Sequence, residues 1–121
     1  LTAFLDKLRG CDVTFAVQDF RSTFAALRPG DVVYCDPPYA PVSATANFTS
    51  YTGGGFGVQE QIDLASEASA AAKPVVLSNH DVPLIRELYA DARLESFPVQ
   101  RFISCNGARR GAARELLAVF P

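Results

Sequence analysis

The chain has 121 residues, of which nearly half are hydrophobic and a fifth are charged, and its net charge is −2. This length and composition are typical of one globular domain. No stretch approaches the roughly 18 apolar residues that a membrane-spanning helix needs, so we expect no membrane partner. The negative net charge excludes a protein that binds nucleic acids nonspecifically over its whole surface. Residues 101–121, however, carry four arginines and a single acid. This basic segment is either a phosphate contact or a solvated loop.

The cysteines and the histidine do not form a known metal or disulfide motif. Cys11, Cys35 and Cys105 are widely spaced, and His80 is the only histidine. We therefore expect no metal site, and free thiols fit a reducing cytoplasm. The chain contains no methionine, so we expect Leu1 to lie inside a longer protein rather than at a translation start.

The first part of the chain predicts two helices that alternate with two strands. Leucine and phenylalanine at helical spacing predict a helix over residues 1–9, which a glycine ends. Residues 11–17 are β-branched and aromatic and predict a strand. Residues 21–30 predict a short helix with Ser22 as N-cap and a Pro-Gly stop. Residues 31–35 predict an apolar strand, which we expect to be covered on both faces.

A long polar segment, residues 40–57, follows, and a loop of this length is usually functional. Residues 58–73 then predict a helix, and residues 74–80 predict a buried strand. The inner side of this helix is predicted to carry Ile62, Leu64, Ala65 and Ala68.

The last part of the chain predicts one helix and two strands. Residues 81–93 predict a helix with Asp81 as N-cap and a proline in its first turn. Residues 94–103 predict a strand, which Pro98 restricts to a sheet edge or a bulge. A final strand is predicted at residues 115–120. The alternation predicts an α/β fold with a mostly parallel sheet and a final antiparallel pair.

Polar residues follow three of these strands, at 18–20, 36–39 and 78–81. Ligands of open α/β sheets bind beyond the carboxyl ends of the strands, so the three segments could line one cleft. The segment "DPPY" at 36–39 is the most unusual, because two prolines make a rigid turn between a carboxylate and an aromatic ring. Carboxylate and carbonyl acceptors beside a flat ring suit a planar ligand with an amino group. The alternative is a strand that ends in a plain proline turn.

"DPPY" has the form that the [DNS]PP[YFW] motif of amino-methyltransferases takes in adenine-N6 enzymes. The longer text, with "CDPPYAPVSATANFTSY", "LSNHD" and "SCNGARRGAARELLAVF", closely resembles the carboxy-terminal half of the DNA adenine methylase (Dam) family. The resemblance is strong over residues 31–120, about three quarters of the chain. It implies part of a Rossmann-like methyltransferase fold, S-adenosylmethionine as methyl donor and duplex DNA as partner. It also implies a site-specific enzyme, encoded by a bacterium or a phage, that flips an adenine out of the duplex and methylates its N6.

The resemblance assigns roles to residues of the turn. Asp36 and the Pro37 carbonyl would accept the two hydrogen bonds of the amino group, and Tyr39 would stack on the flipped base. Asp36 would also border the cofactor, whose adenine would contact Asp19 and Phe20. The alternative for that pair is an N-cap and a core phenylalanine. Substrate contacts are expected from Pro38, Asn47, Tyr51, Asn106, Arg109 and Arg110.

Two parts of the family pattern are absent from the sequence. The glycine-rich cofactor motif and the target-recognition region, which precede "DPPY" in the family, have no counterpart in it. We therefore expect residues 1–121 to be the carboxy-terminal part of a catalytic domain, inactive or weak alone. An exposed sheet edge would then favour self-association.

Two other functions stay open at this point. One is an amino-methyltransferase that acts on RNA or on another amine. The other is a non-catalytic fragment that binds nucleic acid or a protein partner. Methyl transfer after the absent half is added would distinguish the first reading from the non-catalytic one, and competition between DNA and RNA would separate the two enzymes.

Overall fold

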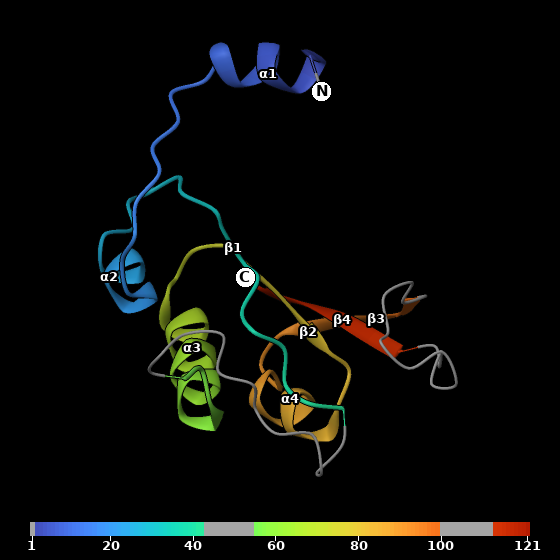
Figure 1. Ribbon diagram of the computed structural model, residues 1–121. Helices are drawn as coiled ribbons and strands as arrows, with labels where there is room; N and C mark the ends of the chain where they lie inside the picture. Colours follow the sequence, from blue (N-terminus) through green and yellow to red (C-terminus); the bar gives the residue numbers. More distant parts are fainter. Residues whose placement is uncertain (1, 43–54, 100–112) are drawn as a thin grey trace.

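The computed structural model describes residues 2–42, 55–99 and 113–121 of the chain. In these residues it contains four helices and four strands (Figure 1). Along the chain they are α1 (Thr2–Arg9), α2 (Phe20–Ala25), β1 (Val33–Cys35), α3 (Val58–Ala70), β2 (Val75–His80), α4 (Pro83–Leu88), β3 (Arg93–Val99) and β4 (Ala113–Phe120). None of the described helices is long and apolar enough to span a bilayer.

The four strands form one mixed sheet in the order β1-β2-β4-β3. β1 runs parallel to β2, with Val33 beside Val75. β4 lies antiparallel to both β2 and β3. The predicted α/β class and the final antiparallel pair are therefore confirmed, but a mostly parallel sheet is wrong. The reason is that β4 returns between β3 and β2, so it makes both of its pairings antiparallel.

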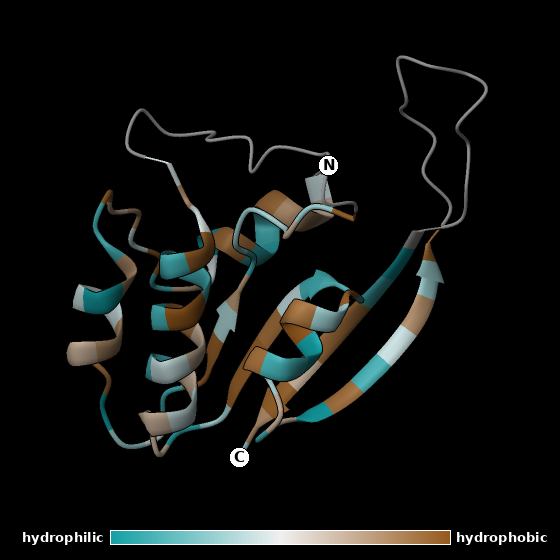
Figure 2. Cartoon of the chain, turned by 90° about the horizontal axis from the view of Figure 1, so that it is seen from below, coloured by the Kyte–Doolittle hydropathy of each residue, from teal (hydrophilic) through white to brown (hydrophobic). Residues whose placement is uncertain are grey.

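The core lies on the face of the sheet that α3 and α4 cover. Alternate residues of the central strands are fully buried there, including Val75 and Leu77 of β2 and Leu116 of β4. Ile85 and Tyr89, from α4 and its C-cap, pack against them. Figure 2 shows hydrophobic residues gathered along the central strands, beside the helices. Alternate side chains of the central strands are thus buried against the apolar sides of the two helices.

The segment before α2 differs from its predicted form. Residues 11–17 do not form a strand, although their composition favours one. A strand is stabilised by hydrogen bonds to a neighbour, and no strand among the described residues pairs with this segment. Its apolar side chains stay outside the core, since Phe15 is 90% and Val17 is 106% exposed. α1 forms as predicted but buries no residue, and Figure 1 shows it well apart from the sheet.

Strand β1 is covered on only one face. Val33 is buried, but Tyr34 and Val32 are largely exposed, so the prediction of two covered faces is wrong. The outer edge of β1 also has no partner strand among the described residues. At the opposite edge, β3 contains Pro98, as the sequence predicts for a proline within a strand.

A helix forms near each predicted segment, but α4 covers only Pro83–Leu88 of the predicted residues 81–93, and Arg93 already belongs to β3. Three other details differ. The N-cap of α2 is Asp19 rather than Ser22, and its carboxylate accepts from the Arg21 backbone N–H. Asp81 does not cap α4, because Val82 holds that position. In α3, Ile62 is exposed, and buried Gln61 lies on the inner side with Leu64, Ala65 and Ala68.

Asp81 instead joins α4 to the last two strands. Its side chain is only 6% exposed and forms an ion pair with Arg86 of α4. Ser96 of β3 donates to the same carboxylate, and Arg114 of β4 lies 3.6 Å from it. These partners, with the Arg86 hydrogen bond as the largest cause, lower the pKa of Asp81 to about 2.

The low pKa of Asp81 predicts acid sensitivity of the fold. A carboxylate whose folded pKa is depressed contributes stability above its unfolded pKa of 3.8 and loses it as the pH falls towards about 2. We expect the free energy of unfolding to drop by about 1–2 kcal/mol across this window, with allowance for the exposure of Arg86. Urea titrations of the chain between pH 5 and pH 2 measure this drop. Asp81→Asn should reduce it, whereas exposed Asp91→Asn should not, and an unchanged drop in Asp81→Asn would contradict the assignment.

Candidate active site

The "DPPY" turn begins where β1 ends. Asp36 follows the last residue of β1, and the parallel neighbour β2 ends at Ser78, Asn79 and His80. Carboxyl ends of parallel strands meet at one edge of a sheet, so the two segments lie together there. Hydrogen bonds from Ser78 to Asp36 and from the Ala40 N–H to Asn79 show that these two of the three predicted strand ends lie side by side.

One oxygen of Asp36 is held and the other is available. The Ser78 hydroxyl donates to Oδ1 of Asp36 at 2.8 Å, and the Tyr34 hydroxyl donates to Ser78 at 3.3 Å. Asp36 itself is exposed. No described residue donates to its Oδ2, so this oxygen can accept a hydrogen bond from a ligand.

A buried amide network holds the prolines from the other side. Gln61 of α3 donates from Nε2 to the Pro38 carbonyl at 2.7 Å. Asn79 accepts the Ala40 N–H at 2.9 Å and donates to Oε1 of Gln61 and to the Tyr89 hydroxyl, each at 3.1 Å. Gln61 and Asn79 are both fully buried. The turn is therefore tied to α3, β2 and the end of α4 together.

The two proline carbonyls differ in their surroundings. The Pro38 carbonyl is occupied by Gln61, whereas no described residue donates to the Pro37 carbonyl. Among the described residues, a carbonyl without a donor thus lies next in sequence to Asp36, whose Oδ2 also has none. Together they offer two acceptors, the number that an amino group with two N–H bonds requires.

Tyr39 is fixed at the end of the turn by His80. The two rings meet edge to face with their centroids 5.0 Å apart, and His80 Nδ1 lies 2.5 Å from the Ala40 carbonyl oxygen. Partial burial raises the pKa of the Tyr39 phenol. The ring therefore stays neutral near pH 7, which suits stacking on a base.

A hollow of about 260 Å³ opens beside the turn, between α2, β1 and α3. Its lining is mostly apolar, with the Phe20 and Phe56 rings 6.0 Å apart. Asp36 and Pro37 also line it, so the turn borders this space. Flat apolar walls next to a carboxylate are suited to an aromatic heterocycle with a polar rim.

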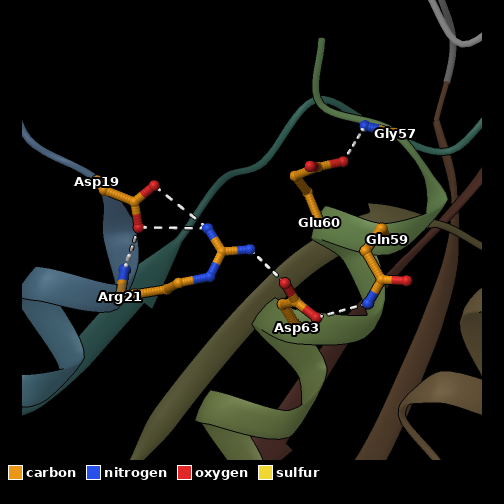
Figure 3. A network of polar contacts seen from close by, with 6 residues as sticks. All are labelled: Asp19, Arg21, Gly57, Gln59, Glu60 and Asp63. Carbon is orange, nitrogen blue, oxygen red and sulfur yellow. Dashed lines mark hydrogen bonds and ion pairs between the residues drawn. The ribbon is translucent and has the colours of Figure 1, made fainter. Parts of the chain in front are cut away.

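Arg21 joins the two helices that form the walls of the hollow. Figure 3 shows its guanidinium between Asp19, at the start of α2, and Asp63 of α3. Hydrogen bonding from Arg21 is the main cause that lowers the pKa of Asp63. The same guanidinium lies 4.4 Å from the centroid of the Phe20 ring. Arg21 therefore helps to set the position of Phe20.

The predicted site residues divide into three groups. Phe20, Asp36 and Pro37 line the hollow, and Pro38 and Tyr39 continue the turn beside it. Asp19 does not line it, because its carboxylate caps α2 and pairs with Arg21. The predicted substrate contacts Asn47, Tyr51, Asn106, Arg109 and Arg110 lie outside the described residues.

Gln61 was missed by the sequence reasoning, and Ser78 and Asn79 were noted only as the polar end of a strand. The buried position of Gln61 was not predicted, because glutamine in an amphipathic helix is expected on the solvent side. A usable signal was its position one turn before Leu64 and Ala65, within the apolar stripe. Among the described residues, no group of three or more His, Cys, Asp or Glu side chains could hold a metal ion.

Loss of the Asn79 side chain should destabilise the whole chain. Asn79→Ala removes the buried partner of the Ala40 N–H, of the Tyr89 hydroxyl and of Oε1 of Gln61. We expect a loss of about 2–3 kcal/mol in the free energy of unfolding, measured by urea denaturation. Exposed Gln59→Ala should cost much less, and equal losses in the two variants would contradict the network.

Comparison with known proteins agrees with this geometry. Residues 1–103 match the D12 class N6 adenine-specific DNA methyltransferases. A DNA adenine methylase of Vibrio cholerae is 48% identical over 111 residues, which is 88% of this chain and 40% of the relative. The Escherichia coli enzyme of that name is 44% identical over 109 residues, covering 88% and 39%. That of Serratia marcescens is 43% identical over 121 residues, covering 97% and 44%.

The chain thus spans about 40% of the length of these curated relatives. The family match covers most of the chain and includes the turn, the hollow and β2. The resemblance noted from the "DPPY" text is confirmed, and the chain belongs to the D12 class N6 adenine-specific DNA methyltransferase family.

Proposed function

We propose that this chain supplies the amino-group site of a DNA adenine-N6 methyltransferase. The observation that carries the proposal is a pair of acceptors that no described residue occupies, Oδ2 of Asp36 and the Pro37 carbonyl, on two residues that line the hollow. An adenine amino group that donates to both would have its nitrogen lone pair directed away from them. Such positioning is the main catalytic device available to the site.

The hollow is the place that we propose for the methyl donor. S-adenosylmethionine carries an adenine ring, and the Phe20 and Phe56 rings offer it an apolar wall next to Asp36. When bound, this cofactor supplies an activated methyl group on a sulfonium. The protein then needs no covalent intermediate and no strong base, because the amino nitrogen becomes acidic only as it is alkylated. We propose Asp19 as a further contact only if Arg21 releases it.

Tyr39 is proposed to stack on the target base. Its ring is half-buried and neutral, and it packs edge to face with the His80 ring. Stacking of a base on an aromatic side chain contributes about 1–3 kcal/mol, which helps to offset the cost of removing a base from the duplex. For the regions outside the described residues, we propose Asn47 and Tyr51 near the flipped base, and Asn106, Arg109 and Arg110 near the DNA backbone. Since the matched relatives are bacterial and DNA is the proposed substrate, we propose a cytoplasmic enzyme.

Removal of the Asp36 carboxylate should stop methyl transfer. The test uses a graft enzyme, in which this chain replaces the matching part of the Vibrio cholerae DNA adenine methylase. Asp36→Ala should lower the rate of transfer to duplex DNA by at least about 100-fold, because an acceptor of the amino group is lost. Exposed Asp91→Ala is the control. Near-normal turnover of Asp36→Ala would refute the proposed role of the turn. Preferred methylation of competing RNA would refute the proposal that duplex DNA is the substrate.

We also expect the isolated chain to self-associate. The outer edge of β1 is unpaired among the described residues, and Val32, Tyr34, Phe15 and Val17 expose apolar surface. Unpaired edges and apolar patches favour pairing between copies. Sedimentation velocity should show a weight-average mass that rises with concentration. Tyr34→Lys and Val32→Lys should shift the chain towards monomer, whereas a monodisperse monomer at all concentrations would overturn the expectation.

A further inference from the structure

Gln61 is a polar side chain in an apolar position. It lies on the inner side of α3, between the helix and the sheet, and is 0% exposed. Its neighbours on the same side are Leu64, Ala65 and Ala68, which pack in the core. Burial of an amide lowers stability unless both ends are hydrogen-bonded, so its presence there calls for a partner at each end.

Both ends of the Gln61 amide have such partners. Nε2 donates to the Pro38 carbonyl, and Oε1 accepts from Asn79, which is in turn fixed by the Ala40 N–H and the Tyr89 hydroxyl. The amide can therefore take only one orientation. Reversed, its oxygen would face the Pro38 carbonyl oxygen and its nitrogen would face the Asn79 donor.

The turn depends on such outside help because of its own sequence. Pro37 and Pro38 have no N–H, so neither can donate a hydrogen bond that closes the turn. The orientation of the peptide that carries the Pro38 carbonyl is set by a side chain of another element, Gln61. The neighbouring Pro37 carbonyl has no such partner among the described residues, and Pro37 is one of the residues that line the hollow.

We propose that Gln61 is a positioning residue for methyl transfer. By holding the Pro38 carbonyl, it keeps that acceptor out of the site and presents the Pro37 carbonyl and Asp36 together to the substrate amino group. This inference rests on the proposed function, because it needs an amino group as ligand. It assigns to Gln61 an effect on the geometry of the reacting complex and not on substrate affinity.

The first test compares two equal substitutions on α3 in the graft enzyme. Gln61→Met keeps the length and volume of the side chain but removes its donor, and Gln59→Met makes the same change at an exposed position. We expect Gln61→Met to lower kcat by about 10- to 100-fold, the effect of a small misplacement of reacting groups. The KM for DNA and for S-adenosylmethionine should change less than twofold. Gln59→Met should retain both constants.

The second test distinguishes a lost donor from a lost fold. In Gln61→Glu the new side chain has the same shape, and burial raises the pKa of its carboxyl group. When protonated, this carboxyl can donate to the Pro38 carbonyl, and when ionised it cannot. The kcat of Gln61→Glu relative to Gln59→Glu should therefore rise at least about fivefold from pH 8.5 to pH 6.0, as a return of the donor predicts. The same ratio for the two methionine variants should stay constant.

The outcomes separate this inference from the proposed function. If the unsubstituted graft enzyme transfers no methyl group to DNA, the proposed function fails and the inference fails with it. If it is active and Gln61→Met has the kcat of Gln59→Met, the positioning role alone is overturned. A Gln61→Met enzyme with a raised KM and a normal kcat, or a Gln61→Glu ratio that is independent of pH, would overturn it as well.

Discussion

Two successive prolines leave the turn after β1 without backbone donors at its centre, so side chains of other elements must hold it. Ser78 holds Asp36, Gln61 holds the Pro38 carbonyl, and Asn79 holds Ala40. These partners come from β2 and α3, which are also the elements that carry the core. The stability of the fold and the geometry of the turn therefore depend on the same buried amide network. A substitution in this network changes both the stability and the geometry.

The hollow beside the turn depends on a second connection. Arg21 bridges α2 and α3 through Asp19 and Asp63 and lies against the ring of Phe20 (Figure 3). These groups are partly exposed, so the bridge adds little stability and mainly sets the direction of the Phe20 wall. One side of the site is thus held by buried amides, while the other is joined by a partly exposed ion-pair bridge. Such a division suits a site in which the amino group must be placed accurately and a cofactor must enter and leave.

Sequence patterns predicted the elements with strong local signals. The helix of α3, the strand β2 and the final antiparallel pair follow from periodicity and from turn residues. The prediction of a strand at residues 11–17 was wrong, because a β-type composition forms a strand only beside a partner strand. No partner strand is present in the described residues. The turn itself could be predicted because "DPPY" is rare and resembles a known motif. Gln61 could not, because its role comes from the contact of α3 with a turn 23 residues earlier in the chain, which local pattern does not encode.

A calorimetric titration of the chain with S-adenosylmethionine tests the central claim, that the hollow bordered by Asp36 is formed within these residues. The account predicts binding that both Phe20→Ala and Asp36→Ala weaken, because the first removes the apolar wall and the second removes the carboxylate at its border. Exposed Asp91→Ala should leave the binding constant unchanged. A folded chain that binds no cofactor, or one whose affinity neither substitution changes, would contradict it.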